Sequence, residues 1–399
     1  MMYRAILALI LTVGLHFFAQ AQADTATAVE SPAGGASHYR ISLLTCGPGE
    51  EVWETFGHAC IRVIDSSKTD AERDKIYNYG FFESSEGNSI WSQAFSGRVV
   101  DLLDTITFEE LMIEYRIKKR SITEQVFELD EQQKELVVAF LKKNLRRENR
   151  YYDFDTFYDN CSTRIRDLFT IIFGNRFQYG AAVPKDSRIT FRDVTVTTLC
   201  PAQHKYWFGF AVNILYASRT DRVMSNHEAM FLPSLLSNGM SDATIDGRKI
   251  CSSRTVIQDE TIDWEKRANQ PFYILLLLSV FTICALLIPK SPIPGRIMST
   301  VVLLLTGIAG CLILRWWFMN GEPAWKDNFN VLWALPTNLL VPFLGKRAKR
   351  LYAAVAITLL IGALLLHLLR VQIMPVFEIS SLLLALLFVF GAMYRNTAR

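Results

Sequence analysis

A cysteine at the start of a predicted helix is the first side chain of this sequence that could carry out chemistry. Apolar residues recur at helical spacing from Cys161 to Phe173, and Gly174 is a typical helix stop. Asp159 or Asn160 can cap this helix, so Cys161 lies in its first turn. Backbone N–H groups and the helix dipole favour a thiolate there, and two nearby arginines add positive charge. The alternative to a reactive thiol is a structural, buried or disulfide-bonded cysteine.

A reactive thiol needs a base, and the chain has six histidines. His16 and His367 fall in apolar segments that predict an export signal and a membrane span. Among the other four we favour His58, because it begins a predicted strand directly after the small residue Gly57. The remaining candidates, in the linker and in the loop-rich end of the exported part, are His38, His204 and His227.

A third group should orient the imidazole, and Asn78 is the candidate. It lies in the next predicted strand, within the Tyr-Asn-Tyr-Gly run 77–80, on the opposite strand face from both tyrosines. A turn or edge asparagine is the alternative. Cys60 shares a strand face with His58, but no second ligand pair at zinc spacing is present. Neither a metal nor a cofactor is therefore expected.

The elements that must position these residues follow an export signal. Residues 1–23 combine Arg4, an apolar run from Ala5 to Ala19 and two A-x-A cleavage sites. Residues 24–38 form a linker rich in Ala, Ser, Thr and Gly. An uncleaved anchor helix is the alternative for residues 1–23. In either case the part of the chain that follows is exported.

Residues 39–270 are expected to form a soluble α+β domain. Runs of alternating or β-branched residues predict strands at 39–46, 58–65, 75–82, 99–106 and 121–129. Capping residues and helical periodicity predict helices at 107–118, 130–147 and 161–173.

Residues 271–399 are expected to form a transmembrane domain of five helices. Each of five apolar segments is near the length needed to cross about 30 Å of hydrocarbon. The third segment is the weakest, because it contains two asparagines and two prolines. The segments are Phe272–Ile288, Ile297–Leu314, Phe329–Leu344, Leu351–Leu369 and Ile379–Met393.

Charge placement favours five spans with residues 24–270 outside and the C-terminus in the cytoplasm. Eight basic residues then lie in inner loops and three in outer loops, in agreement with the positive-inside rule. If the third segment did not span, the basic run 346–350 would lie outside. The inner set is Lys290, Arg296, Lys346, Arg347, Lys349, Arg350, Arg395 and Arg399, and the outer set is Arg315, Lys326 and Arg370.

Composition excludes several other classes of protein. The 399 residues are 50% hydrophobic and 20% charged, which is too apolar for a disordered chain and too charged for one that lies wholly in the membrane. The net charge of +3 gives no electrostatic support for a nucleic-acid partner.

Disulfides are expected because the exported part lies in an oxidising environment. Five of the seven cysteines belong to that part, so at least one thiol is left over. Cys200–Cys251 is the preferred bridge, since both residues flank the loop-rich end of the domain. Cys46–Cys60 is the alternative pair, and spacing alone does not decide the connectivity.

Three short motifs resemble the exported domain of the Lnb-type lipoprotein N-acyltransferases. They are Phe56-Gly57-His58, Tyr77-Asn78-Tyr79-Gly80 and Asp159-Asn160-Cys161-Ser162-Thr163-Arg164. The resemblance covers essentially the whole chain and is most specific over residues 40–235; the run from His227 to Pro233 also looks family-like, and it is assigned no role.

The resemblance implies a circularly permuted papain-like domain, similar to NlpC-type and lecithin:retinol-acyltransferase-like enzymes, in which histidine precedes cysteine. It implies Cys161 as nucleophile, His58 as base and Asn78 as the third member. It further implies that an acyl chain moves from a phospholipid through a Cys161 thioester to the N-terminal diacylglyceryl-cysteine of a lipoprotein.

The implied location is the bacterial inner membrane, with the catalytic domain in the periplasm and membrane lipids around the bundle. Two other functions stay open. A membrane-tethered cysteine peptidase or amidase of the cell envelope needs the same dyad, but a single anchor would suffice for it. A non-enzymatic envelope scaffold would hold Cys161 in a disulfide.

Overall fold

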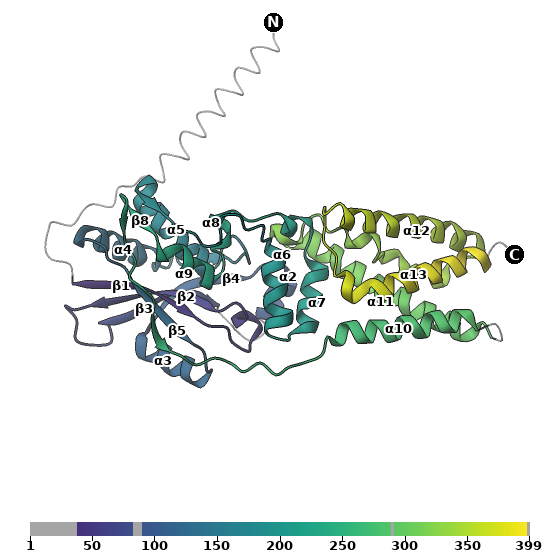
Figure 1. The fold of residues 1–399 in the computed structure, drawn as a ribbon, viewed down its shortest axis with the longest axis horizontal. Helices are drawn as coiled ribbons and strands as arrows, with labels where there is room; N and C mark the ends of the chain where they lie inside the picture. Colours follow the sequence, from purple (N-terminus) through teal and green to yellow (C-terminus); the bar gives the residue numbers. More distant parts are fainter. Residues whose placement is uncertain (1–37, 83–89, 289–290, 397–399) are drawn as a thin grey trace, which may run out of the picture.

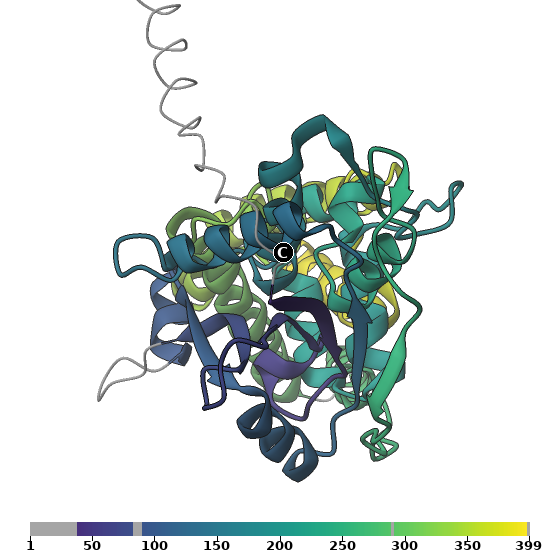
Figure 2. The same ribbon diagram turned by 90° about the vertical axis from the view of Figure 1, so that its left-hand side faces the viewer.

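The computed structural model describes residues 38–82, 90–288 and 291–396. The predicted export signal and most of the predicted linker lie outside these ranges. The described chain divides into a sheet-rich domain and a set of long apolar helices, which Figure 1 shows extending away from the domain, with the C-terminus at the far end. Figure 2 views the protein from the domain end, with the helices behind the domain.

A seven-stranded antiparallel sheet forms the centre of the soluble domain, in the order β10-β5-β1-β2-β3-β4-β6. All five strands predicted from residue alternation are present, with shifts of a few residues at their ends. The strands are β1 Tyr39–Cys46, β2 His58–Asp65, β3 Asp74–Phe82, β4 Val100–Thr107, β5 Ile122–Val126, β6 Tyr151–Asp153 and β10 Thr255–Gln258.

Alternation along the central strands explains how the sheet is covered on both faces. Ile41 and Leu43 of β1 point into the main core, where α4 (Glu131–Asn144), α5 (Cys161–Phe173) and α9 (Pro233–Ser241) pack. Leu44 and Cys46 point to the opposite face, where α3 (Phe108–Ile117) completes a smaller core. The α+β class predicted from the sequence is confirmed.

Several short elements lie outside this sheet. A three-stranded sheet consists of β7 Phe177–Gln178, β8 Thr244–Ile245 and β9 Arg248–Lys249. The short helices are η1 Val52–Glu54, α2 Ile90–Ser96, η2 Gly174–Arg176, α6 Phe191–Thr197, η3 Thr198–Ala202, α7 Tyr206–Leu215, η4 Ser218–Asp221, α8 Asn226–Ala229 and η5 Pro323–Trp325.

The apolar region contains four helices that are long and apolar enough to cross a membrane, among the residues described. Figure 1 shows them side by side along the long axis of the protein. They are α10 Gln270–Leu287, α11 Ile293–Met319, α12 Lys346–Leu368 and α13 Val376–Asn396.

The third predicted helix, over Phe329–Leu344, is not an α-helix. The chain there forms two 3₁₀ helices, η6 Phe329–Leu332 and η7 Pro336–Phe343. Prolines inside the segment lack the N–H that an α-helix needs, and the Asn338 side chain instead donates to Thr306 Oγ1 of α11 at 2.9 Å. The expected five transmembrane helices are therefore four long helices and one 3₁₀ segment in the described chain.

The 3₁₀ segment nevertheless runs the length of the helix bundle. At its start, the Phe329 amide donates to Gln372 Oε1 at 2.6 Å, in the loop after α12 that faces the domain. Near its end, Lys349 of the first turn of α12 donates to the Pro342 carbonyl at 3.4 Å. Between these points it packs on α11, where any side chain at Gly310 would overlap the Ala334 carbonyl.

The predicted disulfides are absent from the structure, in which all seven cysteines are free thiols. Cys251 lies beside the large sheet, in a bridge with Phe127, whereas Cys200 lies between α6 and α7 and contacts Gly209. The expected Cys200–Cys251 bridge is therefore wrong, because the two residues belong to different parts of the domain. Cys46 and Cys60 lie on neighbouring strands with both thiols reduced.

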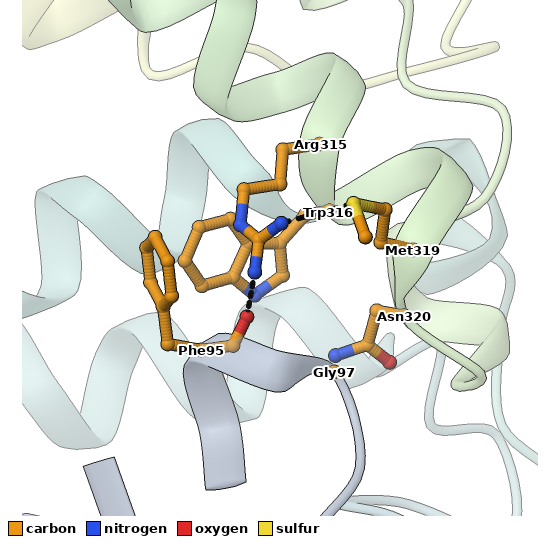
Figure 3. Close-up of a pocket in the computed structure, with 6 residues that line it drawn as sticks. All are labelled: Phe95, Gly97, Arg315, Trp316, Met319 and Asn320. Atoms are coloured by element: carbon orange, nitrogen blue, oxygen red, sulfur yellow. Dashed lines mark hydrogen bonds between the residues drawn. The ribbon is translucent and has the colours of Figure 1, made fainter. Parts of the chain in front are cut away.

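The soluble domain packs closely against the end of α11. Figure 3 shows this contact, a shallow recess lined by Phe95, Gly97, Arg315, Trp316, Met319 and Asn320. The Arg315 guanidinium lies 4.1 Å from the centre of the Phe95 ring and donates to the Phe95 carbonyl. Gly97 has a φ of +90°, and a Cβ at this position would overlap the Met319 carbonyl, so glycine is needed for the close approach.

Candidate functional site

Cys161 is the first residue of α5, as the sequence predicted. Asn160 is the N-cap, and its side-chain oxygen accepts from the Ser162 amide at 2.9 Å and the Thr163 amide at 3.0 Å. Thr163 Oγ1 accepts from the Asn160 amide at 2.7 Å, which completes a capping box. The Asn160 Nδ2 group also donates to the Phe231 carbonyl at 3.1 Å, so the start of the helix is anchored to the main core.

His58 reaches Cys161 because α5 packs across β2. The preceding Gly57 has a φ of +80°, and a Cβ there would lie 2.5 Å from the Cys46 carbonyl oxygen. Only glycine therefore allows the sharp entry into β2. The Ala59 amide, next along the strand, is also close enough to interact with the Cys161 sulfur.

Asn78 completes the arrangement from β3. His58 Nε2 forms a hydrogen bond with Asn78 Oδ1, in which the imidazole donates to the amide oxygen. This bond engages Nε2 and leaves Nδ1 as the ring nitrogen available to the thiol. All three predicted site residues are partly exposed, so the group is accessible from solvent.

The charges of Cys161 and His58 stabilise each other. Burial raises the pKa of the Cys161 thiol, but the His58 imidazolium and the Ala59 amide lower it by more. Burial also lowers the pKa of His58, while the Cys161 thiolate and the Asn78 amide raise it to about 9. Both shifts favour the ion pair of a thiolate and an imidazolium, the form in which a cysteine is most nucleophilic.

Gly80, the last residue of the Tyr-Asn-Tyr-Gly motif, lies at the centre of this site. The register between β3 and β4 shifts between Tyr79 and Phe81, so Gly80 occupies a β-bulge, with a φ of +106°. A Cβ built on Gly80 would lie 3.5 Å from His58 Cε1 and 4.0 Å from Cys161 Cβ. The bulge thus places bare backbone beside the side chains of both His58 and Cys161.

The other histidine candidates make no contact with Cys161 in the described structure. His227 lies in α8, with Nε2 3.6 Å from Asp167 Oδ1. His204 follows η3, and His38 precedes β1. Among the residues that the structure covers, no group of three or more metal-ligating side chains is placed to hold an ion.

Two carboxyl groups near the site were missed by the sequence reasoning. Asp101 of β4 is 6% exposed, and burial raises its pKa to about 7 against the opposing charge of His58. Glu322 follows α11 and accepts from the Thr156 amide at 3.3 Å, in the loop before Cys161. Burial raises the pKa of Glu322 to about 7, with Asp155 adding to the effect. Asp101 could have been singled out from the sequence, because it is an acidic residue inside a predicted apolar strand. No local sequence feature indicated Glu322.

The fold and the site together define a membrane protein with a sheet-rich periplasmic domain and a candidate thiol-enzyme centre. Comparison with known families agrees. The model of the Lnb N-terminal periplasmic domain matches residues 35–194, and that of the Lnb transmembrane domain matches residues 264–399. The chain belongs to the Lnb family, which indicates an enzyme of lipoprotein processing. No curated protein and no solved structure matches the chain significantly.

Proposed function

We propose that the protein is a lipoprotein N-acyltransferase that uses Cys161 as its nucleophile. The observation that carries the proposal is the cluster of Cys161, His58 and Asn78 at the start of a helix, in a domain packed against an apolar helix bundle. The order of histidine before cysteine, with the cysteine helix packed on an antiparallel sheet, supports a permuted papain-like fold.

In the first half-reaction the Cys161 thiolate attacks an acyl ester of a phospholipid. In the first turn of α5 the Ser162, Thr163 and Arg164 amides are taken by Asn160, so the Cys161 amide, together with the Ala59 amide, is the donor for the oxyanion that forms. The C–O bond breaks, and the His58 imidazolium gives its proton to the departing alcohol oxygen. The products are a thioester on Cys161, a lysophospholipid and a neutral imidazole.

In the second half-reaction the α-amine of a diacylglyceryl-modified lipoprotein cysteine attacks the thioester. His58 accepts a proton from the nitrogen, and the Cys161 thiolate is released. Asn78 holds the imidazole in the tautomer that both steps need. A covalent intermediate between two separate substrates gives ping-pong kinetics.

The helix bundle has a purpose in this reaction, because both substrates are membrane lipids. Two contacts described above fix the domain on the bundle, one at Gly97 and one between Glu322 and Thr156. The basic residues at the opposite end of the bundle support a cytoplasmic location for that end and for the C-terminus. The thiol is then held at the outer surface of the inner membrane.

A trapped thioester tests the proposal. The full-length protein, reconstituted in phospholipid vesicles, should gain the mass of one acyl chain on Cys161, and hydroxylamine should remove it. Cys161→Ala should abolish both the adduct and N-acylation of a diacylglyceryl-cysteinyl peptide. Cys200→Ala is the matched control, since burial raises the pKa of that thiol to about 11.

The same experiment also distinguishes the proposed acyltransferase from an envelope peptidase or amidase. A hydrolase would cleave a cell-wall peptide through Cys161 and form no acyl adduct from phospholipid. A fully active Cys161→Ala protein would contradict both mechanisms.

A further inference from the structure

Asp101 is a buried carboxyl group beside the nucleophile that the mechanism above leaves without a role. Its side chain is 6% exposed. In the described ranges no lysine or arginine forms an ion pair with it, although the neighbouring carboxylate of Asp159 is paired with Arg164. Burying a carboxyl group is unfavourable, and the opposing charge here comes from the His58 imidazolium of the site itself, which points to a functional reason for Asp101.

The position of Asp101 is set by the bulge at Gly80. The point where a Cβ of Gly80 would lie is 3.9 Å from Asp101 Oδ2, 3.5 Å from His58 Cε1 and 4.0 Å from Cys161 Cβ. These are ordinary van der Waals distances, so a space of about one methyl group is bounded by the carboxylate, the base and the nucleophile together. A nitrogen atom fits the same space.

Tyr152 gives this space a second polar wall. Asp101 and Tyr152 are direct partners across the β4–β6 pair. The Tyr152 hydroxyl is buried beside the Asp101 carboxylate and, as a hydrogen-bond donor to it, lowers the pKa of that group, while the Arg164 guanidinium lies 4.1 Å from the centre of the Tyr152 ring. The carboxylate oxygens and the lone pairs of the hydroxyl oxygen are acceptors side by side, which suits a ligand with several N–H donors, such as an ammonium group.

The charge of the site changes when the thioester forms, and this change favours a cation. The ionisable groups facing Asp101 are His58 on β2, Cys161 on α5, Tyr152 on β6 and Asp159 in the loop before α5. Acylation removes the Cys161 charge that keeps His58 protonated. The positive charge near Asp101 is then lost, and an incoming ammonium ion can replace it.

We propose that Asp101 binds the α-ammonium group of the acceptor and takes up its proton before the amine attacks the thioester. The inference rests on the proposed acyltransferase function and names the group that selects an amine over water. Burial raises the pKa of Asp101 to about 7, close to the value of about 7.7–8.0 for an α-amino group. The proton therefore moves between them at little cost.

The steps balance as follows in atoms and charge. The ammonium ion gives one proton to the Asp101 carboxylate, and the nitrogen lone pair forms the C–N bond with the thioester carbonyl carbon. A second nitrogen proton passes to His58. The C–S bond breaks, and its electron pair remains on the Cys161 sulfur as the amide departs. Asp101 then loses its proton to solvent, which restores the starting thiolate, imidazolium and carboxylate.

Measuring the two half-reactions separately tests this role. The full-length protein in phospholipid nanodiscs is first allowed to form the thioester, which is quantified by intact mass. A diacylglyceryl-cysteinyl peptide with a free α-amine is then added, or hydroxylamine, which is uncharged near neutral pH. The variant is Asp101→Asn, and the control is Asp104→Asn, on the same strand with a side chain 48% exposed.

Asp101→Asn should form the thioester and react with hydroxylamine within about twofold of wild type, as the control should in all assays. Its transfer to the peptide should fall about 100-fold or more, the effect of losing a positioned proton acceptor. Asp101→Glu, which keeps a carboxylate, should restore part of that loss, and Asp101→Ala takes the place of Asp101→Asn if the latter does not fold.

Two results would overturn the assignment of Asp101. One is peptide transfer at the wild-type rate, and the other is an equal loss in thioester formation, which would mean that Asp101 only positions His58. The absence of a thioester on the wild-type protein would instead refute the acyltransferase function itself, so the two failures are distinguishable.

Discussion

Replacing Asp101 by asparagine should make the protein more stable at alkaline pH while it impairs acyl transfer. Asparagine has nearly the same shape as aspartate and carries no charge. The pKa of Asp101 rises from 3.8 in the unfolded chain to about 7 in the folded protein, because of burial. The folded state therefore binds more protons than the unfolded state between these values, and the stability falls as the pH rises through this range.

The size of the effect follows from the same two values. The difference between 3.8 and about 7 corresponds to at most about 4 kcal/mol of free energy of unfolding, fully expressed above pH 7. Below about pH 4 both aspartate and asparagine are neutral, so the difference should vanish there. The wild-type protein is thus expected to lose more stability than Asp101→Asn between pH 5 and pH 8.

The assay is thermal unfolding of detergent-solubilised protein at a fixed heating rate, over that pH range. The Tm of Asp101→Asn should exceed that of wild type at pH 8, and the two should converge toward pH 5. The control Asp104→Asn, whose side chain is 48% exposed, should follow the wild-type curve. A lower Tm for Asp101→Asn at pH 8 would refute the reasoning, because it would mean that the carboxylate stabilises the fold.

Three further predictions concern the neighbours of the thiol. Asn78→Ala releases Nε2 of His58 and should slow thioester formation about 100-fold, measured as the initial rate of acylation. Thioester formation should rise with pH as Cys161 ionises and fall above about pH 9, where His58 loses the proton it gives to the leaving alcohol. Gly57→Ala should lower the free energy of unfolding by about 1–3 kcal/mol, measured by denaturation, because its φ is positive and its Cβ would meet the Cys46 carbonyl.

Each of these predictions has a contrary outcome. An Asn78→Ala protein with wild-type acylation would show that His58 is oriented by other contacts. A rate that is flat up to pH 10 would mean that His58 is not the acid. Gly247→Ala is the control for Gly57→Ala, since Gly247 also has a positive φ but no atom within 4 Å of its Cβ position; an equal loss in both would leave backbone strain as the whole cause.

The strands and the cysteine helix could be predicted because their information is local. Asn160, Cys161 and Thr163 lie within one helical turn, so the cap and the nucleophile position follow from spacing alone. His58 and Asn78 lie on adjacent antiparallel strands. This pairing is expected because strands joined by a short connection usually lie side by side. The contacts of His58 with Cys161 and with Asn78 are observed, and the catalytic roles of the three residues stay predictions.

The features that could not be predicted depend on contacts between distant parts of the chain. The bulge at Gly80 and the start of α5 bring the site next to Asp101. Glu322 is brought near the site by its hydrogen bond with Thr156, which lies more than 150 residues earlier in the chain. The prediction of a helix over Phe329–Leu344 failed because hydropathy reports burial in an apolar surrounding and not backbone conformation. There the asparagines and prolines are accommodated by the neighbouring α11.

That 3₁₀ segment has a consequence for how the protein is made. Its buried polar groups are satisfied by partners elsewhere: Asn338 bonds to Thr306 of α11 and to Tyr352 of α12, and Asn330 donates to the Ile214 carbonyl of α7. Such a segment gains little by entering a lipid bilayer alone. We therefore expect it to insert late during biosynthesis, after α11 is in place and once α12 has left the ribosome, so that a nascent chain halted at residue 345 leaves it outside the bilayer.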